Sequence, residues 1–152
     1  MKKIIAGIFR HPNNRLYTTF YCNEADGSVN RAITDTLLDL IEQSSPDYDD
    51  ELEALVLQAE AGQYVSPNLD LPDWGANETN IWLVPPMAKP GYVCISNEYT
   101  DFSSDDGGEP QQFTYAQFKA ALAHWREFMR QVEREGKEKL VGKRFEAVLP
   151  DA

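Results

Sequence analysis

One amphipathic segment near the C-terminus constrains the fold of this chain more than any other feature. Its apolar residues recur at three- and four-residue steps and are Tyr115, Phe118, Leu122, Trp125, Met129 and Val132. This spacing places them on one face of a helix. Thr114, with Gln117 three residues later, forms a capping box, and Gly136 is suited to end the helix. We therefore predict a helix over residues 115–135 that covers a sheet, with Phe118, Leu122, Trp125 and Met129 in the core.

Two further helices and five strands are predicted from the remaining apolar residues. Apolar side chains at i, i+4, i+7 and i+8 from Ile33 predict a helix over residues 30–43. Pro46 suits the first turn of a second helix, which we expect to end near Gly62. The predicted strands are residues 3–9, 16–22, 81–84, 92–96 and 145–149.

Neither the helical nor the strand period holds in the rest of the chain. Residues 65–80 and 98–108 are predicted to be irregular loops, and residues 137–139 a polar link. The resulting order of elements is β-β-α-α-β-β-α-β. It predicts an α+β fold in which one largely antiparallel sheet is covered by helices, with residues 1–152 forming a single domain. A chain of this length buries roughly 70% of its unfolded surface, which is enough for a full core.

Acidic residues are concentrated in the middle of the chain. Residues 32–118 contain 17 Asp and Glu and a single basic residue, Lys89, so these 87 residues carry a formal charge of −16, against −11 for the whole chain. A field of this sign attracts cations or a basic protein surface, and it repels nucleic-acid phosphates and anionic lipid. We therefore expect a basic protein partner, no nucleic acid and no membrane.

Three acidic segments are candidates for the surface that binds this partner. They are the start of the second predicted helix and the two irregular loops, which also carry aromatic residues. The candidate partner-binding residues are Asp47, Asp49, Asp50, Glu51, Asp70, Asp73, Trp74, Glu78, Glu98, Tyr99, Asp101, Phe102, Asp105 and Asp106. Aromatic anchors surrounded by charge of one sign are typical of protein-binding surfaces. The same rings can instead pack into the core from a loop.

The residues that most often support catalysis form no recognisable motif here. His11 lies in a predicted turn, and His124 lies one position off the apolar face of the long helix. Neither has a spacing that ties it to a nucleophile, so each is interpreted as a surface or boundary residue. Cys22 and Cys94 each lie in a predicted strand among apolar neighbours, which indicates small buried side chains.

The nearest approach to a metal-binding motif is a calcium-loop-like run that starts at Asp101. The match fails because Asp106 and Gln112 occupy the positions of the turn glycine and the final glutamate. Phosphate-binding loops, dinucleotide fingerprints and paired Cys-x-x-Cys motifs are absent from the sequence. We expect no resident metal and no cofactor.

The distribution of apolar residues bears on the location of the chain. No apolar run approaches the ~20 residues needed to span a bilayer. The run over residues 4–9 is too short for the core of a signal peptide. We therefore expect a cytoplasmic protein.

The order of segments in the second half of the chain resembles that of a known class of proteins. A predicted strand over residues 92–96 is followed by an acidic loop, and residues 113–118 then lead into the aromatic helix that contains Trp125. In this order, and as a small acidic α+β domain, the chain resembles the immunity proteins that bacteria make against the nuclease domains of polymorphic or contact-dependent toxins. The resemblance implies tight binding of a basic toxin, whose active site is covered or distorted by acidic side chains that replace the substrate's phosphates.

Three functions therefore have to be compared. The favoured hypothesis is a cytosolic, immunity-type inhibitor that neutralises a basic toxin or nuclease through its acidic surface. The second is an adaptor or regulatory protein of unknown partner, in which the charge serves mainly solubility. The third is an enzyme of unrecognised type, with His11, His124 or a carboxylate pair in a cleft.

Overall fold

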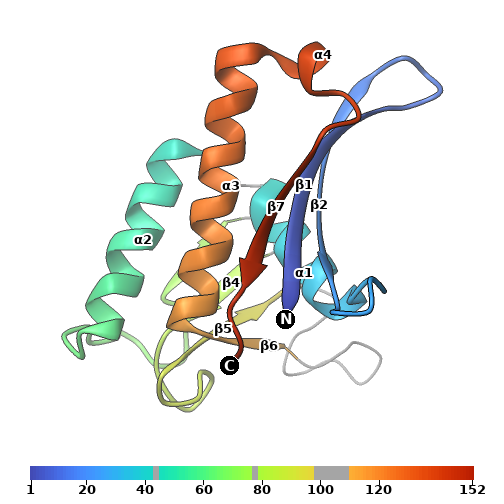
Figure 1. Cartoon of the computed structure of the whole chain (residues 1–152). Helices are drawn as coiled ribbons and strands as arrows, with labels where there is room; N and C mark the ends of the chain where they lie inside the picture. Colours follow the sequence, from blue (N-terminus) through green and yellow to red (C-terminus); the bar gives the residue numbers. More distant parts are fainter. Residues whose placement is uncertain (43–44, 77–78, 98–109) are drawn as a thin grey trace. The chain divides into compact units, whose positions relative to one another are not determined.

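Helices and antiparallel sheets together give this protein an α+β structure, as the sequence predicts. The computed structural model describes residues 1–42, 45–76, 79–97 and 110–152 (Figure 1). Backbone contacts divide the chain into unit 1, which is residues 1–38 and 120–151, and unit 2, which is residues 39–119. The described strands form two sheets where the sequence predicts one, and each unit holds one sheet. The single-domain organisation stays a prediction.

Unit 1 is built on a three-stranded antiparallel sheet in the order β2-β1-β7 (Figure 1). The strands are β1 (Lys2–Arg10), β2 (Leu16–Asn23) and β7 (Arg144–Leu149). β1 and β2 are the first two predicted strands, and they form a hairpin in which Ala6 pairs with Phe20 and Phe9 with Tyr17. A Cβ atom at Gly7 would come within 3.0 Å of the carbonyl oxygen of Lys143. The glycine therefore allows the chain entering β7 to approach β1 closely.

α3 (Tyr115–Glu135) is the helix that the sequence predicts, with the same bounds. Both hydrogen bonds of the capping box are present: the Thr114 amide donates to Gln117 Oε1 at 3.0 Å, and the Gln117 amide donates to Thr114 Oγ1 at 3.1 Å. At the other end the amide of Gly136, which has a φ of 81°, donates to the Val132 carbonyl oxygen. The helix therefore begins and ends through local signals that are readable in the sequence.

The part of α3 that belongs to unit 1 packs on one face of the sheet through aromatic rings. Trp125 meets Phe20 edge-on with 5.6 Å between ring centroids, and Phe128 lies 5.3 Å from Phe145. Phe118, Leu122 and Trp125 are buried as predicted, whereas the prediction for Met129 is wrong because its side chain is exposed. The covered side of the helix extends instead to Ala121 and Phe128, both of which are buried.

Two smaller helices complete unit 1. α1 (Arg31–Glu42) starts in this unit, where Asn30 Oδ1 accepts from the Ile33 amide and Thr34 Oγ1 accepts from the Cys22 amide of β2. α4 (Lys137–Leu140) is a single helical turn where the sequence predicts a polar link. It is followed by a backbone hydrogen bond of 3.2 Å from Gly142 to the Ile8 carbonyl oxygen, which holds this segment against β1.

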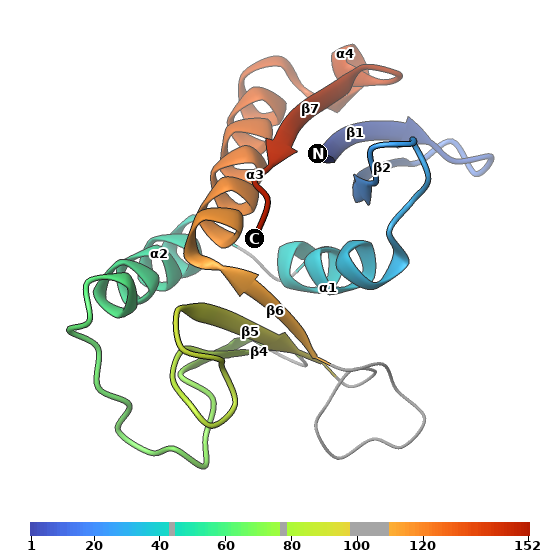
Figure 2. The same ribbon diagram turned by 60° about the horizontal axis from the view of Figure 1, so that its bottom comes forward.

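Unit 2 contains a four-stranded antiparallel sheet in the order β3-β4-β5-β6. Its strands are β3 (Trp74–Ala76), β4 (Thr79–Trp82), β5 (Tyr92–Ser96) and β6 (Gln111–Thr114). Figure 2 shows β4, β5 and β6 side by side. The prediction of an unbroken loop over residues 65–80 is wrong, because β3 and the start of β4 lie within it. β6 was not predicted. β3 and β6 are short strands that contain glycine or glutamine. They form here because β4 and β5 supply strands for them to pair with.

α2 (Pro46–Glu60) is the second predicted helix and lies in unit 2. Ser45 is its N-cap, and its hydroxyl accepts from the Tyr48 amide. The core of the unit gathers apolar side chains from the two central strands and β6, together with Leu52 and Val56 of α2. Within this core the indole N–H of Trp82 donates to Ser96 Oγ at 3.0 Å.

Both cysteines are free and fully buried, as the sequence predicts. Burial raises the pKa of Cys22 to about 11 and the pKa of Cys94 to about 12. A buried, protonated thiol is a poor nucleophile. We expect neither cysteine to react with a thiol reagent at pH 8 in the folded protein and both to react in denaturant, as measured by intact mass. Rapid labelling of either residue under native conditions would contradict the placement of that side chain.

Candidate protein-binding surfaces

The two units differ strongly in charge. Unit 2 contains 16 Asp and Glu against two basic residues, which gives a net charge of −14, whereas unit 1 contains nine acidic and 12 basic residues, which gives +3. Of the two basic residues in unit 2, Lys119 forms an ion pair of 2.7 Å with Glu60, and the Lys89 ammonium lies 5.8 Å from the centre of the Tyr92 ring. The excess acid of the chain therefore resides in unit 2.

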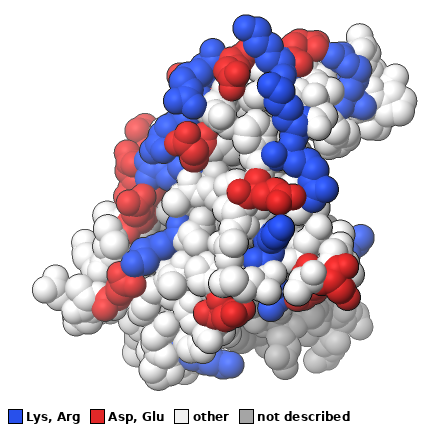
Figure 3. Space-filling view, in the orientation of Figure 1, with Lys and Arg blue, Asp and Glu red and all other residues white. Residues whose placement is uncertain are grey.

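The exposed side of α2 is one place where this acid reaches solvent. Asp47, Asp50 and Glu51 are exposed near its start, and Leu57 is exposed near its end. Figure 3 shows acidic side chains over the beginning of this helix. Asp47 lies in the first turn, where the positive end of the helix dipole also stabilises an acid. Its position therefore has a structural cause as well.

The segment after α2 exposes large apolar side chains. Val65 is 82% exposed, Leu69 55% and Leu71 58%. Hydrogen bonds give this segment a defined shape: the amides of Asp70 and Leu71 donate to Asn68 Oδ1 and to the Asn68 carbonyl oxygen, at 2.9 and 3.1 Å. Large apolar side chains held on an ordered turn beside an acid are typical of protein-binding surfaces. We call residues 65–71 the apolar loop.

Asp73 anchors the end of this segment to the sheet of unit 2. Its carboxylate accepts from the Tyr64 hydroxyl at 2.7 Å and from the Leu83 amide at 2.8 Å, and its own amide donates to the Ile81 carbonyl oxygen. Burial, followed by the bond to Asp73, raises the pKa of Tyr64 to about 12, so the phenol remains a donor at neutral pH. Asp73, which follows the apolar loop, thus binds both Tyr64, which precedes the loop, and Leu83. These bonds hold the two ends of the loop in place.

The structure separates the predicted partner-binding residues into two groups. Asp47, Asp50, Glu51 and Asp70 are exposed, whereas Asp49 and Trp74 are buried and Asp73 is bound within the unit. The Trp74 ring meets the Tyr48 ring edge-on with 6.4 Å between centroids, so the start of α2 and the segment after the apolar loop lie together. Trp74 packs inward, as in the alternative that the sequence left open, although it does so from β3 and not from a loop.

The remaining predicted residues lie outside the described part of the chain. They are Glu78, Glu98, Tyr99, Asp101, Phe102, Asp105 and Asp106. Residues 101–109 of the calcium-loop-like run lie there too, and so does the second acidic loop. Their assignment to a partner surface stays a prediction.

Sequence reasoning missed a second exposed patch, which lies in unit 1. Phe9 and Tyr17 form a stacked pair with 5.6 Å between centroids, and they are 45% and 39% exposed. His11 meets the Tyr17 ring edge-on at 5.7 Å. A signal was present in the sequence, because an aromatic residue stands on each side of the predicted turn in a hairpin, where the two face each other.

Neither histidine contacts a nucleophile within the described residues. His11 Nδ1 accepts from the Asn13 amide, and His124 Nε2 lies 2.9 Å from the Phe145 carbonyl oxygen. Across the described ranges, histidine, cysteine and carboxylate side chains form no group of three or more that could hold a metal ion. Of the helices that the structure describes, none is both long and apolar enough to cross a bilayer. The candidate functional surfaces are therefore the apolar loop and the patch of Phe9 and Tyr17.

No protein-family model matches the chain, and neither the curated proteins nor the solved structures include a match to it. The class that can be named is therefore structural: an α+β protein whose acidic unit exposes an ordered apolar loop.

We predict that Asp73 and Asp70 differ in their effect on stability although they are three residues apart. Asp73→Ala leaves the Leu83 amide and the Tyr64 hydroxyl without their acceptor, which costs about 1–3 kcal/mol. Asp70→Ala removes an exposed carboxylate and should change the free energy of unfolding by no more than about 0.5 kcal/mol. Urea unfolding of both variants measures the difference, and equal effects would contradict the bridging role of Asp73.

His124 should make stability depend on pH. Burial lowers its pKa in the folded state, and the hydrogen bond to Phe145 only partly opposes this effect. The unfolded chain, with an ordinary pKa of about 6.5, then binds more protons, so stability falls as the pH drops below that value. We expect His124→Gln to flatten urea midpoints measured between pH 5.5 and 7.5. An unchanged pH dependence in this variant would contradict the role of His124.

Proposed function

We propose that this chain is an immunity-type inhibitor that binds a basic protein, such as a toxin nuclease, in the cytoplasm through unit 2. The observation that carries the proposal is the combination of a −14 charge with exposed leucines on an ordered loop. Charge of one sign accelerates the encounter with an oppositely charged protein. Apolar side chains at the centre of such a surface supply contact energy that charge alone does not.

The proposed binding surface combines two parts of unit 2. One is the exposed start of α2, with Asp47 and Glu51; the other is the apolar loop, with Leu69, Asp70 and Leu71. A cationic substrate-binding cleft normally receives phosphates. Carboxylates from this surface would occupy the same positions and exclude the substrate. This is the mode of action that the resemblance to immunity proteins implies.

The pre-formed shape of the apolar loop supports a role in binding. The bonds made by Asn68 and Asp73 order the loop without a partner present. A loop that is already ordered loses less conformational entropy when it binds. Leu69 and Leu71 are then available as anchors at low entropic cost.

The test begins with capture of the partner from the native host at low ionic strength and continues with the purified pair. We expect a basic partner whose affinity falls steeply as salt is raised, since the attraction between exposed charges is screened. Asp47→Lys, Glu51→Lys and Asp70→Lys combined should weaken binding by about tenfold or more. The matched control reverses three exposed acids of unit 1, Glu133→Lys, Glu135→Lys and Asp151→Lys, with the same change in net charge.

Two outcomes would contradict the proposal. Equal weakening by the control would show that net charge alone governs binding, and an acidic partner would remove the basis for the interaction. Inhibition is tested separately by expressing the partner with and without this chain. If the partner is harmless to the cell in both cases, an adaptor or regulatory role replaces the inhibitor.

A further inference from the structure

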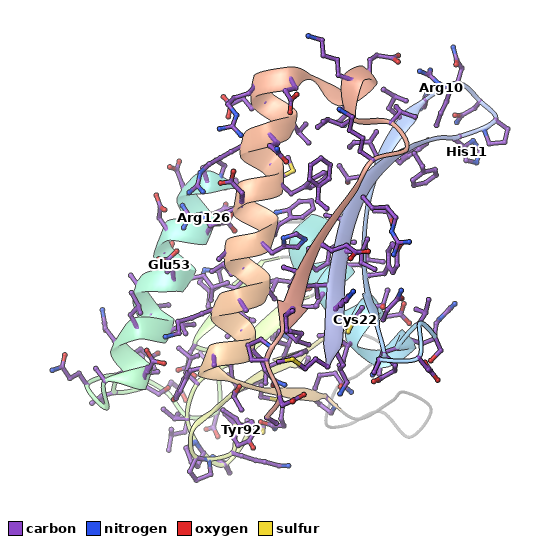
Figure 4. The ribbon with its side chains drawn as sticks, viewed as in Figure 1. Arg10, His11, Cys22, Glu53, Tyr92 and Arg126 are labelled. Atoms are coloured by element: carbon purple, nitrogen blue, oxygen red, sulfur yellow. The ribbon has the colours of Figure 1, made fainter. Side chains whose placement is uncertain are left out.

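Unit 1 carries a surface that complements the apolar loop of unit 2 in both charge and chemistry. We call it the tip surface, and its residues are Phe9, His11, Arg15, Tyr17, Lys143 and Arg144. Figure 4 shows His11 at the turn that joins β1 and β2. The surface belongs to unit 1 alone and is separate from the partner surface described above.

The tip surface is held together by strand pairing. Phe9 pairs with Tyr17, and Gly7, two residues before Phe9, pairs with both Thr19 and Arg144. Residues that pair across antiparallel strands share a face of the sheet, and so do residues two apart along a strand. The two aromatic rings and Arg144 therefore lie on the same face. It is the opposite face from that of Ala6, Phe20 and Phe145, on which α3 packs.

The chain segments that carry these rings and Arg144 are rich in basic residues. Residues 9–17 and 137–144 are joined by the ion pair between Arg10 and Glu138, and together they contain six Lys and Arg and one acid. That is a net charge of +5 within 17 residues of a chain whose total is −11. Arg144 also pairs with Glu146 at 3.2 Å, whereas Arg15 and Lys143 are exposed. Figure 3 shows Lys and Arg side chains gathered over the end of α3 and over α4.

The ring pair also has a structural role, because a cross-strand aromatic pair stabilises a hairpin. That role does not require the rings to be open to solvent, and it does not explain the basic residues beside them. An exposed apolar centre with a charged rim is the arrangement of a docking surface. The charge requires an acidic occupant.

We infer that the tip surface of one copy binds the apolar loop of a second copy, head to tail. The loop offers Val65, Leu69 and Leu71 to the rings of Phe9 and Tyr17, and Asp70 to the basic rim. The two surfaces are opposite in charge, so they attract each other. Both also expose apolar side chains, which the contact would bury. Because the surfaces differ, the contact is heterologous and leaves one tip and one loop open in each dimer.

Nucleic acid is the competing occupant, since stacked aromatics beside cations also bind single strands. The second copy is favoured because the −14 unit of the same chain repels phosphates, whereas in a second copy that unit supplies the acidic charge that the tip surface lacks. The two occupants are separated by experiment with the full chain.

The test uses two variants whose substitutions lie on exposed residues. The tip variant carries Arg15→Glu and Lys143→Glu, and the loop variant carries Leu69→Ser and Leu71→Ser. We expect wild-type protein to associate with rising concentration in sedimentation velocity, less so at high salt. Each variant alone should associate about tenfold more weakly or worse. An equimolar mixture should form a heterodimer, because the loop of the tip variant and the tip of the loop variant are both intact.

Matched controls separate this contact from changes in charge or apolarity elsewhere. Arg31→Glu with Lys89→Glu changes the net charge by the same amount as the tip variant, and Leu57→Ser removes an exposed leucine outside the apolar loop. Both controls should associate as the wild type does. Phe9→Ser serves as a second tip variant, and circular dichroism verifies that every variant is folded.

Three results would overturn the inference. They are a wild-type monomer at every concentration, two variants that fail to complement each other on mixing, and binding of a labelled single-stranded oligonucleotide that the tip variant abolishes. None of these results bears on the capture of a basic partner by unit 2. The inference and the proposed function can therefore fail independently.

Discussion

The structure depends on one electrostatic constraint: an ionised carboxylate cannot be buried without partners. Unit 2 holds 16 acids in 81 residues, so almost every one of them must stay on the surface or be given a hydrogen-bonded place inside. Asp73 has such a place, because the Tyr64 hydroxyl and the Leu83 amide both donate to it. The core of the unit is consequently left to the two central strands, β6 and one side of α2. The acids define what the unit presents to other molecules.

The same constraint explains why the apolar loop is informative. An exposed leucine by itself is ordinary, since much of any protein surface is apolar. Val65, Leu69 and Leu71 differ because all three lie within seven residues of one ordered loop, in a unit of net charge −14. A loop with no binding role could expose polar residues at these positions at no cost. Interpreting the loop as part of a binding surface accounts for its composition and for its order.

Unit 1 shows how an aromatic core leaves an aromatic surface. α3 covers one face of the sheet, where Phe20 and Phe145 meet Trp125 and Phe128. Side chains alternate between the faces of a strand, so Phe9 and Tyr17 fall on the other face. On that face Ile5 is buried, whereas Phe9 and Tyr17, nearer the hairpin turn, are exposed.

Local signals were readable in the sequence, whereas non-local ones were not. α3 was predicted with the correct bounds because the capping box and the apolar period agree, and both act within a few residues. β3 and β6 were missed because their pairing depends on strands elsewhere in unit 2, as does the division into two sheets. The acids illustrate the same limit: Asp70 and Asp73 are equivalent in sequence, yet one is exposed and the other bridges Tyr64 and Leu83. The amide of Leu83, ten residues from Asp73, determines which of the two acids is bound within the unit. Neither the composition nor the residue spacing of the sequence predicts this contact.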